Sequence, residues 1–202
     1  MPSFFNLTPQ PARALFLLVT LLTLSACQNL QTSDIQSTDA LTANHQLVKW
    51  RAEGKIKIVT NGESQTAAFD WQQHKGNYAI HFFGPFGAGS SWLRRTSKGV
   101  TLELPDRPPM QASSPEQLLF DAAGWQAPIS NLQYWIKGVP APKTPATQNP
   151  EISSEGIAFE QAGWQISAER LKDTDGFVLP GKVSGSDGNT QVTVVIKRWE
   201  KR

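Results

Sequence analysis

The amino-acid sequence predicts a mainly β fold of the α+β class. In this fold a strongly curved antiparallel sheet forms an open, unclosed barrel, and short helices cover the opening. Three observations lead to the prediction. Apolar and polar residues alternate in both halves of the chain, turn signals separate the alternating segments, and two capped helical segments interrupt them in the middle.

The first half predicts one short helix followed by an antiparallel meander. Residues 39–50 favour the helix, and a strand with one dry and one wet face begins near Lys49. Asn61 and Gly62 then form a typical hairpin signal. Further strands are expected over residues 66–73, 78–83, 90–96 and 100–104.

The middle of the chain predicts two short helices. In the first, Ser114 is the expected N-cap, Pro115 occupies the first helical position and Gly124 stops the helix. In the second, Ser130 is the expected N-cap and Gly138 the stop. These helices are expected to lie over the open side of the sheet.

The second half returns to strands after a connector. Residues 139–150 are rich in proline and are expected to be that connector. Strand signals resume over residues 156–161, 163–170, 176–185 and 190–200.

The beginning of the chain predicts export. Arg13 precedes an apolar run over residues 14–24, and Leu24-Ser25-Ala26-Cys27 follows with the small residues of a cleavage site. Residues 1–26 are therefore expected to be a signal peptide. The tetrapeptide is similar to a bacterial lipobox, which implies acylation of Cys27. The alternative is an ordinary secretory signal with an incidental cysteine.

The rest of the chain predicts one domain. Residues 27–38 read as the lipidated cysteine and a flexible polar tether, and residues 39–202 have a length that suits a single domain with its own core. Cys27 is the only cysteine, so the domain has no internal disulfide. The formal net charge is only +2 and no long basic block is present, which argues against nucleic acid as a partner.

Catalytic and cofactor motifs are not evident in the sequence. The three histidines, at positions 45, 74 and 81, show no metal-ligand spacing, so neither a metal nor a cofactor is expected. Acidic residues are scattered, which leaves a catalytic carboxylate pair open. The segment "GFVLPGKV" comes close to a phosphate-binding loop, but Val183 replaces the required hydroxyl and Pro180 removes an amide donor. The sequence therefore predicts a protein that is not an enzyme and does not use ATP.

The order of these segments resembles the LolB family of outer-membrane lipoprotein receptors. The resemblance covers nearly the whole chain and is carried by the lipobox, the strand with Gly54, "FDWQQ", "YAIHFFGPFG", "WIKGVP", Pro180 and the C-terminal strand. It implies a monomer, anchored to the outer membrane and facing the periplasm, that accepts acylated lipoprotein cargo from a LolA-like periplasmic carrier. It also implies insertion of the cargo into outer-membrane lipid without ATP. Gln28 follows the cysteine where, in enterobacterial lipoproteins, an aspartate would argue for retention in the inner membrane, so sorting to the outer membrane is expected.

The resemblance also implies a membrane-insertion loop at Pro85, Phe86 and Gly87. Phe86 stands where family members often carry leucine, and an apolar side chain at a turn tip is otherwise disfavoured. The alternative is that Phe86 folds back onto the core.

The family function further calls for an apolar cavity that holds acyl chains beneath the helices. Its expected lining residues lie at inward-facing strand positions or on the helices: Trp50, Ile56, Phe69, Trp71, Ile80, Phe82, Leu118, Trp135, Ile136, Trp164 and Ile166. The alternative for each is ordinary core packing, which would suit a structural or assembly lipoprotein of the envelope with a filled β core. A periplasmic hydrolase is a third and weaker alternative.

Overall fold

A computed structural model describes residues 39–84 and 89–202. The described residues belong to a compact unit, Asp39–Arg202, that contains its own hydrophobic core. The expected signal peptide, Cys27 and the tether lie outside the described residues. The expected insertion-loop residues, Pro85, Phe86 and Gly87, lie outside them as well.

The sheet has eleven antiparallel strands and two open edges. The strand order is β6-β5-β4-β3-β2-β1-β13-β12-β9-β8-β7, so β6 and β7 do not pair and the sheet is not closed. Its strands in the first half are β1 (Lys49–Thr60), β2 (Glu63–His74), β3 (Asn77–Phe83), β4 (Ser90–Thr96), β5 (Gly99–Glu103) and β6 (Met110–Ala112). Those in the second half are β7 (Ala146–Ser153), β8 (Gly156–Gln161), β9 (Trp164–Glu169), β12 (Lys182–Ser186) and β13 (Thr190–Lys201). The predicted open antiparallel sheet is confirmed.

The C-terminal strand β13 joins the two halves of the sheet by pairing with both β1 and β12. The pairing with β1 shifts register between Glu53 and Gly54. A Cβ at Gly54 would lie 2.0 Å from the backbone oxygen of Val195, so only glycine fits here. At the other end of β1, Asn61 and Gly62 both adopt positive φ and form the expected hairpin turn to β2.

The first of the two helices predicted for the middle of the chain is α3 (Pro115–Ala123), and its caps are as expected. The Ser114 hydroxyl accepts a hydrogen bond from the Gln117 amide, and Gly124 is left-handed. The second helix, α4 (Ile129–Trp135), begins at Pro128 rather than at the expected N-cap, Ser130.

Ser130 does not cap α4 because it lies in the first helical turn. There its amide and hydroxyl both donate to the carboxylate of Glu116, at 2.7 and 3.1 Å. A side chain of α3 thus satisfies the free amide that a local cap would otherwise serve. At the other end Gly138 is left-handed, as expected, and residues 39–46 form the short helix that precedes β1.

Two expectations for the second half are corrected. The predicted connector over residues 139–150 is partly strand, because β7 begins at Ala146. Pro150 is tolerated there because β7 is an edge strand that pairs only with β8. The single strand expected over residues 176–185 is broken at Pro180 into β11 (Phe177–Leu179) and β12, and β11 forms a separate hairpin with β10 (Lys172–Thr174).

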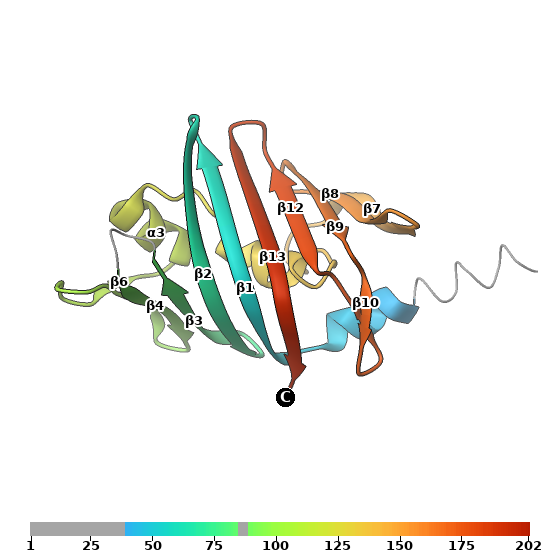
Figure 1. Cartoon of the computed structure of the whole chain (residues 1–202), viewed down its shortest axis with the longest axis horizontal. Coiled ribbons are helices and arrows are strands. Elements are labelled where there is room, and N and C mark those ends of the chain that lie inside the picture. Colours follow the sequence, from blue (N-terminus) through green and yellow to red (C-terminus); the bar gives the residue numbers. More distant parts are fainter. Residues whose placement is uncertain (1–38, 85–88) are drawn as a thin grey trace, which may run out of the picture. The chain divides into compact units, whose positions relative to one another are not determined.

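The core lies between one face of the sheet and the helices. In Figure 1, β2, β1, β13 and β12 run side by side, and the yellow segment that contains α4 lies behind them. Along β1, β3 and the second half of β2, buried residues alternate with more exposed ones. This period-two pattern places one apolar face of the sheet against the helices.

Candidate functional site

All eleven predicted lining residues lie in one buried cluster. They come from β1, β2, β3, α3, β9 and the α4 segment, and each is at most 9 % exposed. Aromatic rings pack against one another inside the cluster, with ring centroids 5.5 Å apart for Trp50 and Trp71 and 5.8 Å apart for Trp135 and Trp164. The structure therefore brings the predicted residues together, and side chains fill most of the space between them.

One apolar crevice remains beneath α4. It lies between that helix and strands β9, β12 and β13, and its walls include Leu132, Trp135, Trp164, Ile166 and Val183. The crevice is too narrow to hold a water molecule in this conformation. The interior is therefore closed at this crevice, and three of the predicted lining residues, Trp135, Trp164 and Ile166, touch it.

The crevice adjoins a groove that opens to the surface. This groove of about 370 Å³ runs along α3 and the segment after it. Trp164 and Pro128 line both the groove and the crevice, so these two residues separate the surface from the interior. Phe120, which is 52 % exposed, lines the same groove and gives it an apolar side.

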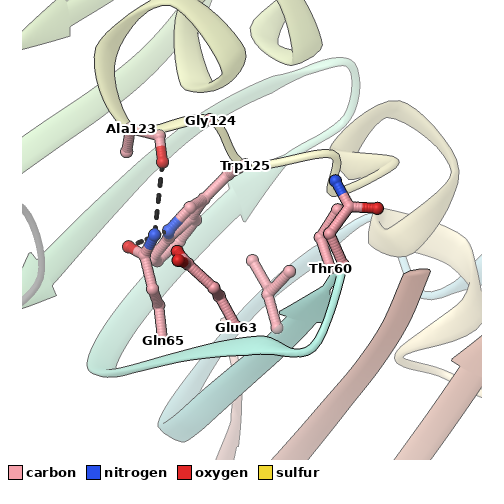
Figure 2. Close-up of a pocket in the computed structure, with 8 residues that line it drawn as sticks. Thr60, Glu63, Gln65, Ala123, Gly124 and Trp125 are labelled. Carbon is pink, nitrogen blue, oxygen red and sulfur yellow. Dashed lines mark hydrogen bonds between the residues drawn. The ribbon is translucent and has the colours of Figure 1, made fainter. Parts of the chain in front are cut away.

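Gln65 attaches the loop after α3 to the sheet. Its amide nitrogen donates to the Ala123 carbonyl at 3.3 Å, and its amide oxygen accepts from the Trp125 indole at 2.5 Å. Figure 2 shows these contacts in a second pocket of about 280 Å³, with Glu63 beside Gln65 and Thr60 across from them. One side chain of β2 thus positions the loop that leads from α3 to Pro128.

Two further glutamines, which lie on the sheet, hold α4 and the segment that follows it. Gln73 accepts from the Trp71 indole at 2.9 Å and donates to Gln133 of α4 at 3.1 Å. Gln161 accepts from the Trp135 indole at 2.8 Å and also bonds the backbone of Ala141. The helices therefore meet the sheet through large apolar contacts and a small number of specific amide hydrogen bonds.

The sequence analysis did not identify these glutamines. A signal was present at Gln73 and Gln161, since both are buried at positions where the alternation calls for an apolar residue. A buried amide needs hydrogen-bond partners, and tryptophan indoles need an acceptor. A glutamine on the dry face of a tryptophan-rich sheet therefore indicates a buried Trp–Gln pair.

Lys137, in the "WIKGVP" segment, is buried rather than solvated. Its ammonium group donates to the carbonyls of Asn44 and Leu47, at 2.8 and 3.0 Å, at the C-terminal end of the helix at residues 39–46. Asn44 in turn donates to the Lys137 carbonyl at 3.0 Å. Burial lowers the pKa of Lys137 to about 8. The α4 segment and the N-terminal helix are thereby joined by reciprocal hydrogen bonds.

The ends of the predicted insertion loop lie close together. The Gly84 amide donates to the Gly89 carbonyl at 3.0 Å, at the end of the β3–β4 hairpin. Within residues 39–84 and 89–202 no group of three metal-ligating side chains occurs. In the same part of the chain no helix has the length and hydropathy that a membrane crossing requires.

Sequence comparisons give one consistent match. The family model described as outer membrane lipoprotein LolB matches residues 48–199. An outer-membrane lipoprotein LolB of Cellvibrio japonicus is 37% identical over 160 residues, which cover 76% of this chain and 78% of that protein. The corresponding protein of Pseudomonas aeruginosa is 34% identical over 157 residues, covering 78% and 77%.

A comparison of folds agrees in architecture. A LolA superfamily protein of Nitrosomonas europaea superposes with a TM-score of 0.50, over 82% of this chain and 93% of that one. The two sequences are 7% identical, so this similarity concerns the fold alone.

Proposed function

Because the chain belongs to the LolB family of outer-membrane lipoproteins, we propose that it accepts acylated lipoproteins from a LolA-like periplasmic carrier and inserts them into the outer membrane without ATP. The observation that carries this proposal is the apolar crevice beneath α4, which meets a surface groove at Trp164 and Pro128. The interior of the sheet is the receiving compartment for acyl chains, and the groove is its mouth.

The energetics require such a compartment. Burying acyl chains contributes about 0.8 kcal/mol per CH₂, so three chains of about 16 carbons represent some tens of kcal/mol. Without ATP, transfer proceeds only if the chains leave one apolar environment as they enter another. A single phenylalanine contributes only about 1.5 to 3 kcal/mol on burial, so Phe86 acts at the membrane without driving the transfer.

The attachments of the helices determine how the crevice opens. The loop between α3 and α4 is held to the sheet by Gln65, by a weak bond of 3.4 Å from Thr190 to Gln126 and by the buried ring of Trp125. Breaking these local contacts costs less than unfolding the sheet. Movement of this loop together with Trp164 widens the crevice, and the incoming acyl chains replace the side-chain contacts that are lost.

The anchor and the loop complete the proposal. Acylation of Cys27 with more than one chain holds the protein stably at the membrane. Phe86 then contacts the bilayer where cargo leaves. Phe86→Glu should leave folding and cargo loading near normal while insertion slows, because a charge at the turn tip resists burial in lipid. The two steps are measured separately in a reconstituted transfer reaction, and equal loss of loading and insertion would contradict this division.

Native mass spectrometry tests the cargo complex directly. The chain is prepared without residues 1–26 and with Cys27→Ala, changes that lie outside the compact unit, and is incubated with an acylated lipoprotein. A one-to-one complex that disappears when the cargo lacks its acyl chains is the expected result. The mass of the free protein tests the expected monomer, and cleaved cargo would indicate a hydrolase instead.

A structural envelope lipoprotein is the second candidate. The observation that favours it is the close packing of the interior, where ten of the eleven predicted lining residues are at most 4 % exposed. Such a protein would form no acyl-dependent complex. The same mass spectra therefore decide between the two functions.

A further inference from the structure

The outer face of β3 and β4 carries a row of stacked side chains. The His81 ring lies between two aromatic rings, with centroid distances of 3.9 Å to Phe83 and 4.1 Å to Trp92. The His81 and Trp92 rings are nearly parallel, at 5°, and the guanidinium of Arg94 lies 4.3 Å from the Trp92 centroid. We call these four residues, Phe83, His81, Trp92 and Arg94, the outer strip.

The outer strip is accessible and held in place. Its members alternate with buried residues of the same strands, such as Phe82 and Leu93, so they point away from the core. Phe83 is 45 % exposed, and the other three are partly exposed. The Ser90 hydroxyl hydrogen-bonds Nε2 of His81. Burial also lowers the pKa of His81, which favours the neutral ring in the stack.

A basic groove begins at the Arg94 end of the strip. It has a volume of about 320 Å³, and its charged and titratable lining residues are Lys49, His74, Tyr78, Arg94, Arg95 and Arg202. No aspartate or glutamate lines it. Acids lie nearby: Glu103 pairs with Arg94 and Glu200 with Arg202, while Asp70 interacts with Arg202 and Glu116 with Tyr78. The charged side chains that line the groove itself are all cations, which leaves its surface positive.

The strip changes from apolar to cationic along one direction. Phe83 stands at one end, beside the hairpin end closed by Gly84 and Gly89, and the basic groove stands at the other. Phe83 and Ala79, which lines the groove, are four positions apart on β3, so the distance between them is about 13 Å. The polar layer of a membrane leaflet is roughly 5 to 8 Å thick. An inclined strip can therefore reach from the phosphate level to the hydrocarbon boundary.

We propose that the outer strip and the basic groove bind the surface of a phospholipid bilayer that contains anionic lipids. The groove receives lipid phosphates, as its charge excess requires, and Trp92 lies at the polar boundary that tryptophan prefers. Phe83 enters the hydrocarbon edge. This contact goes beyond the proposed function, because it needs neither cargo nor an open crevice. It orients the β3–β4 hairpin end toward the membrane.

Vesicle flotation without cargo tests the contact. The chain without residues 1–26 and with Cys27→Ala is mixed with vesicles of phosphatidylcholine, with or without phosphatidylglycerol. Binding is expected to be stronger with the anionic lipid and to weaken in high salt. Phe83→Ser should lower partitioning about five-fold on both vesicle types, since roughly half of that side chain remains to be buried.

A charge variant tests the groove. Lys49→Gln removes one exposed cation of the groove and should lower binding about five-fold on anionic vesicles only. Each variant has a matched control. Phe83→Leu keeps an apolar side chain at the same position, and, elsewhere in the unit, Lys172→Gln changes an exposed cation on β10. Both should bind as the unchanged protein does, and urea unfolding verifies that every variant is folded.

Three outcomes would overturn the proposal. Equal wild-type binding to both vesicle types would show that anionic headgroups are not part of the contact. If the control variants lost as much vesicle binding as the strip and groove variants, the outer strip would not be the surface that contacts the membrane. Unchanged vesicle binding, together with loss of capture by the LolA-like carrier in Phe83→Ser, would assign the strip to a protein surface instead. Cargo loading is measured separately by mass spectrometry, so failure of this contact and failure of the proposed function are distinguishable.

Discussion

Replacing Lys137 with methionine should remove a pH dependence of stability that the wild-type protein shows above pH 8. Methionine keeps most of the side-chain volume and removes the ammonium group that donates to the carbonyls of Asn44 and Leu47. Those two bonds do not fully replace the water lost on burial. The pKa of Lys137 is consequently lowered from 10.5 to about 8 in the folded protein.

The sign and size of this pH dependence follow from the difference in proton binding between the folded and unfolded states. Between pH 8 and 10.5 the unfolded chain binds a proton at Lys137 that the folded protein has released, so the free energy of unfolding rises with pH in this window. The gain from pH 8 to pH 10 is about 2 kcal/mol for a shift of this size. Below pH 8 the contribution is flat, because both states are then protonated.

Urea unfolding at several pH values between 8 and 10 measures this effect. The wild-type midpoint should rise by about 1 M relative to that of Lys137→Met, given a urea dependence of roughly 2 kcal/mol per M. His45, whose pKa is also lowered, titrates below this range and does not interfere. Lys57→Met, which changes an exposed lysine of β1, is the matched control and should keep the wild-type slope. Parallel wild-type and Lys137→Met profiles would refute the reasoning.

Three further changes test the crevice, the strand junction and the buried amides. Gly185→Val places a side chain against Ile166 and Trp164, where a Cβ alone already meets atoms at 3.1 and 3.3 Å; it should lower the yield of acyl-dependent complex about ten-fold while the fold persists. Gly54→Ala should lower the free energy of unfolding by about 3 kcal/mol, since its Cβ meets a backbone oxygen of β13. Gln161→Ala, which removes four hydrogen bonds, should cost about 3 kcal/mol in the same urea experiment.

Local signals predicted most of the strands and helices because they depend on neighbouring residues. The alternation in β1, the hairpin at Asn61 and Gly62 and the cap at Ser114 are all found where expected. Predictions failed where a distant group replaced the local one. Ser130 does not cap α4 because Glu116 supplies the acceptor from another helix.

The residues that line the candidate site were predicted, but whether the space between them is open was not. Period two identifies which side chains face inward, and Trp135 and Ile166 are both in the buried cluster. Whether the space between such side chains is empty depends on how their volumes fit together in three dimensions. The sequence likewise left Lys137 unmarked, because its burial depends on the N-terminal helix packing beside it.

By itself the sequence determined the inward and outward faces of the strands, the start of α3 and the hairpin turn at Asn61 and Gly62. Each of these depends on residues that lie within a few positions of one another. Only the tertiary structure decided that β13 joins the two halves, that glutamines hold the helices over the sheet and that Trp164 closes the crevice. These features arise from contacts between residues far apart in the chain, whose energies are set by packing and desolvation and leave no periodic pattern.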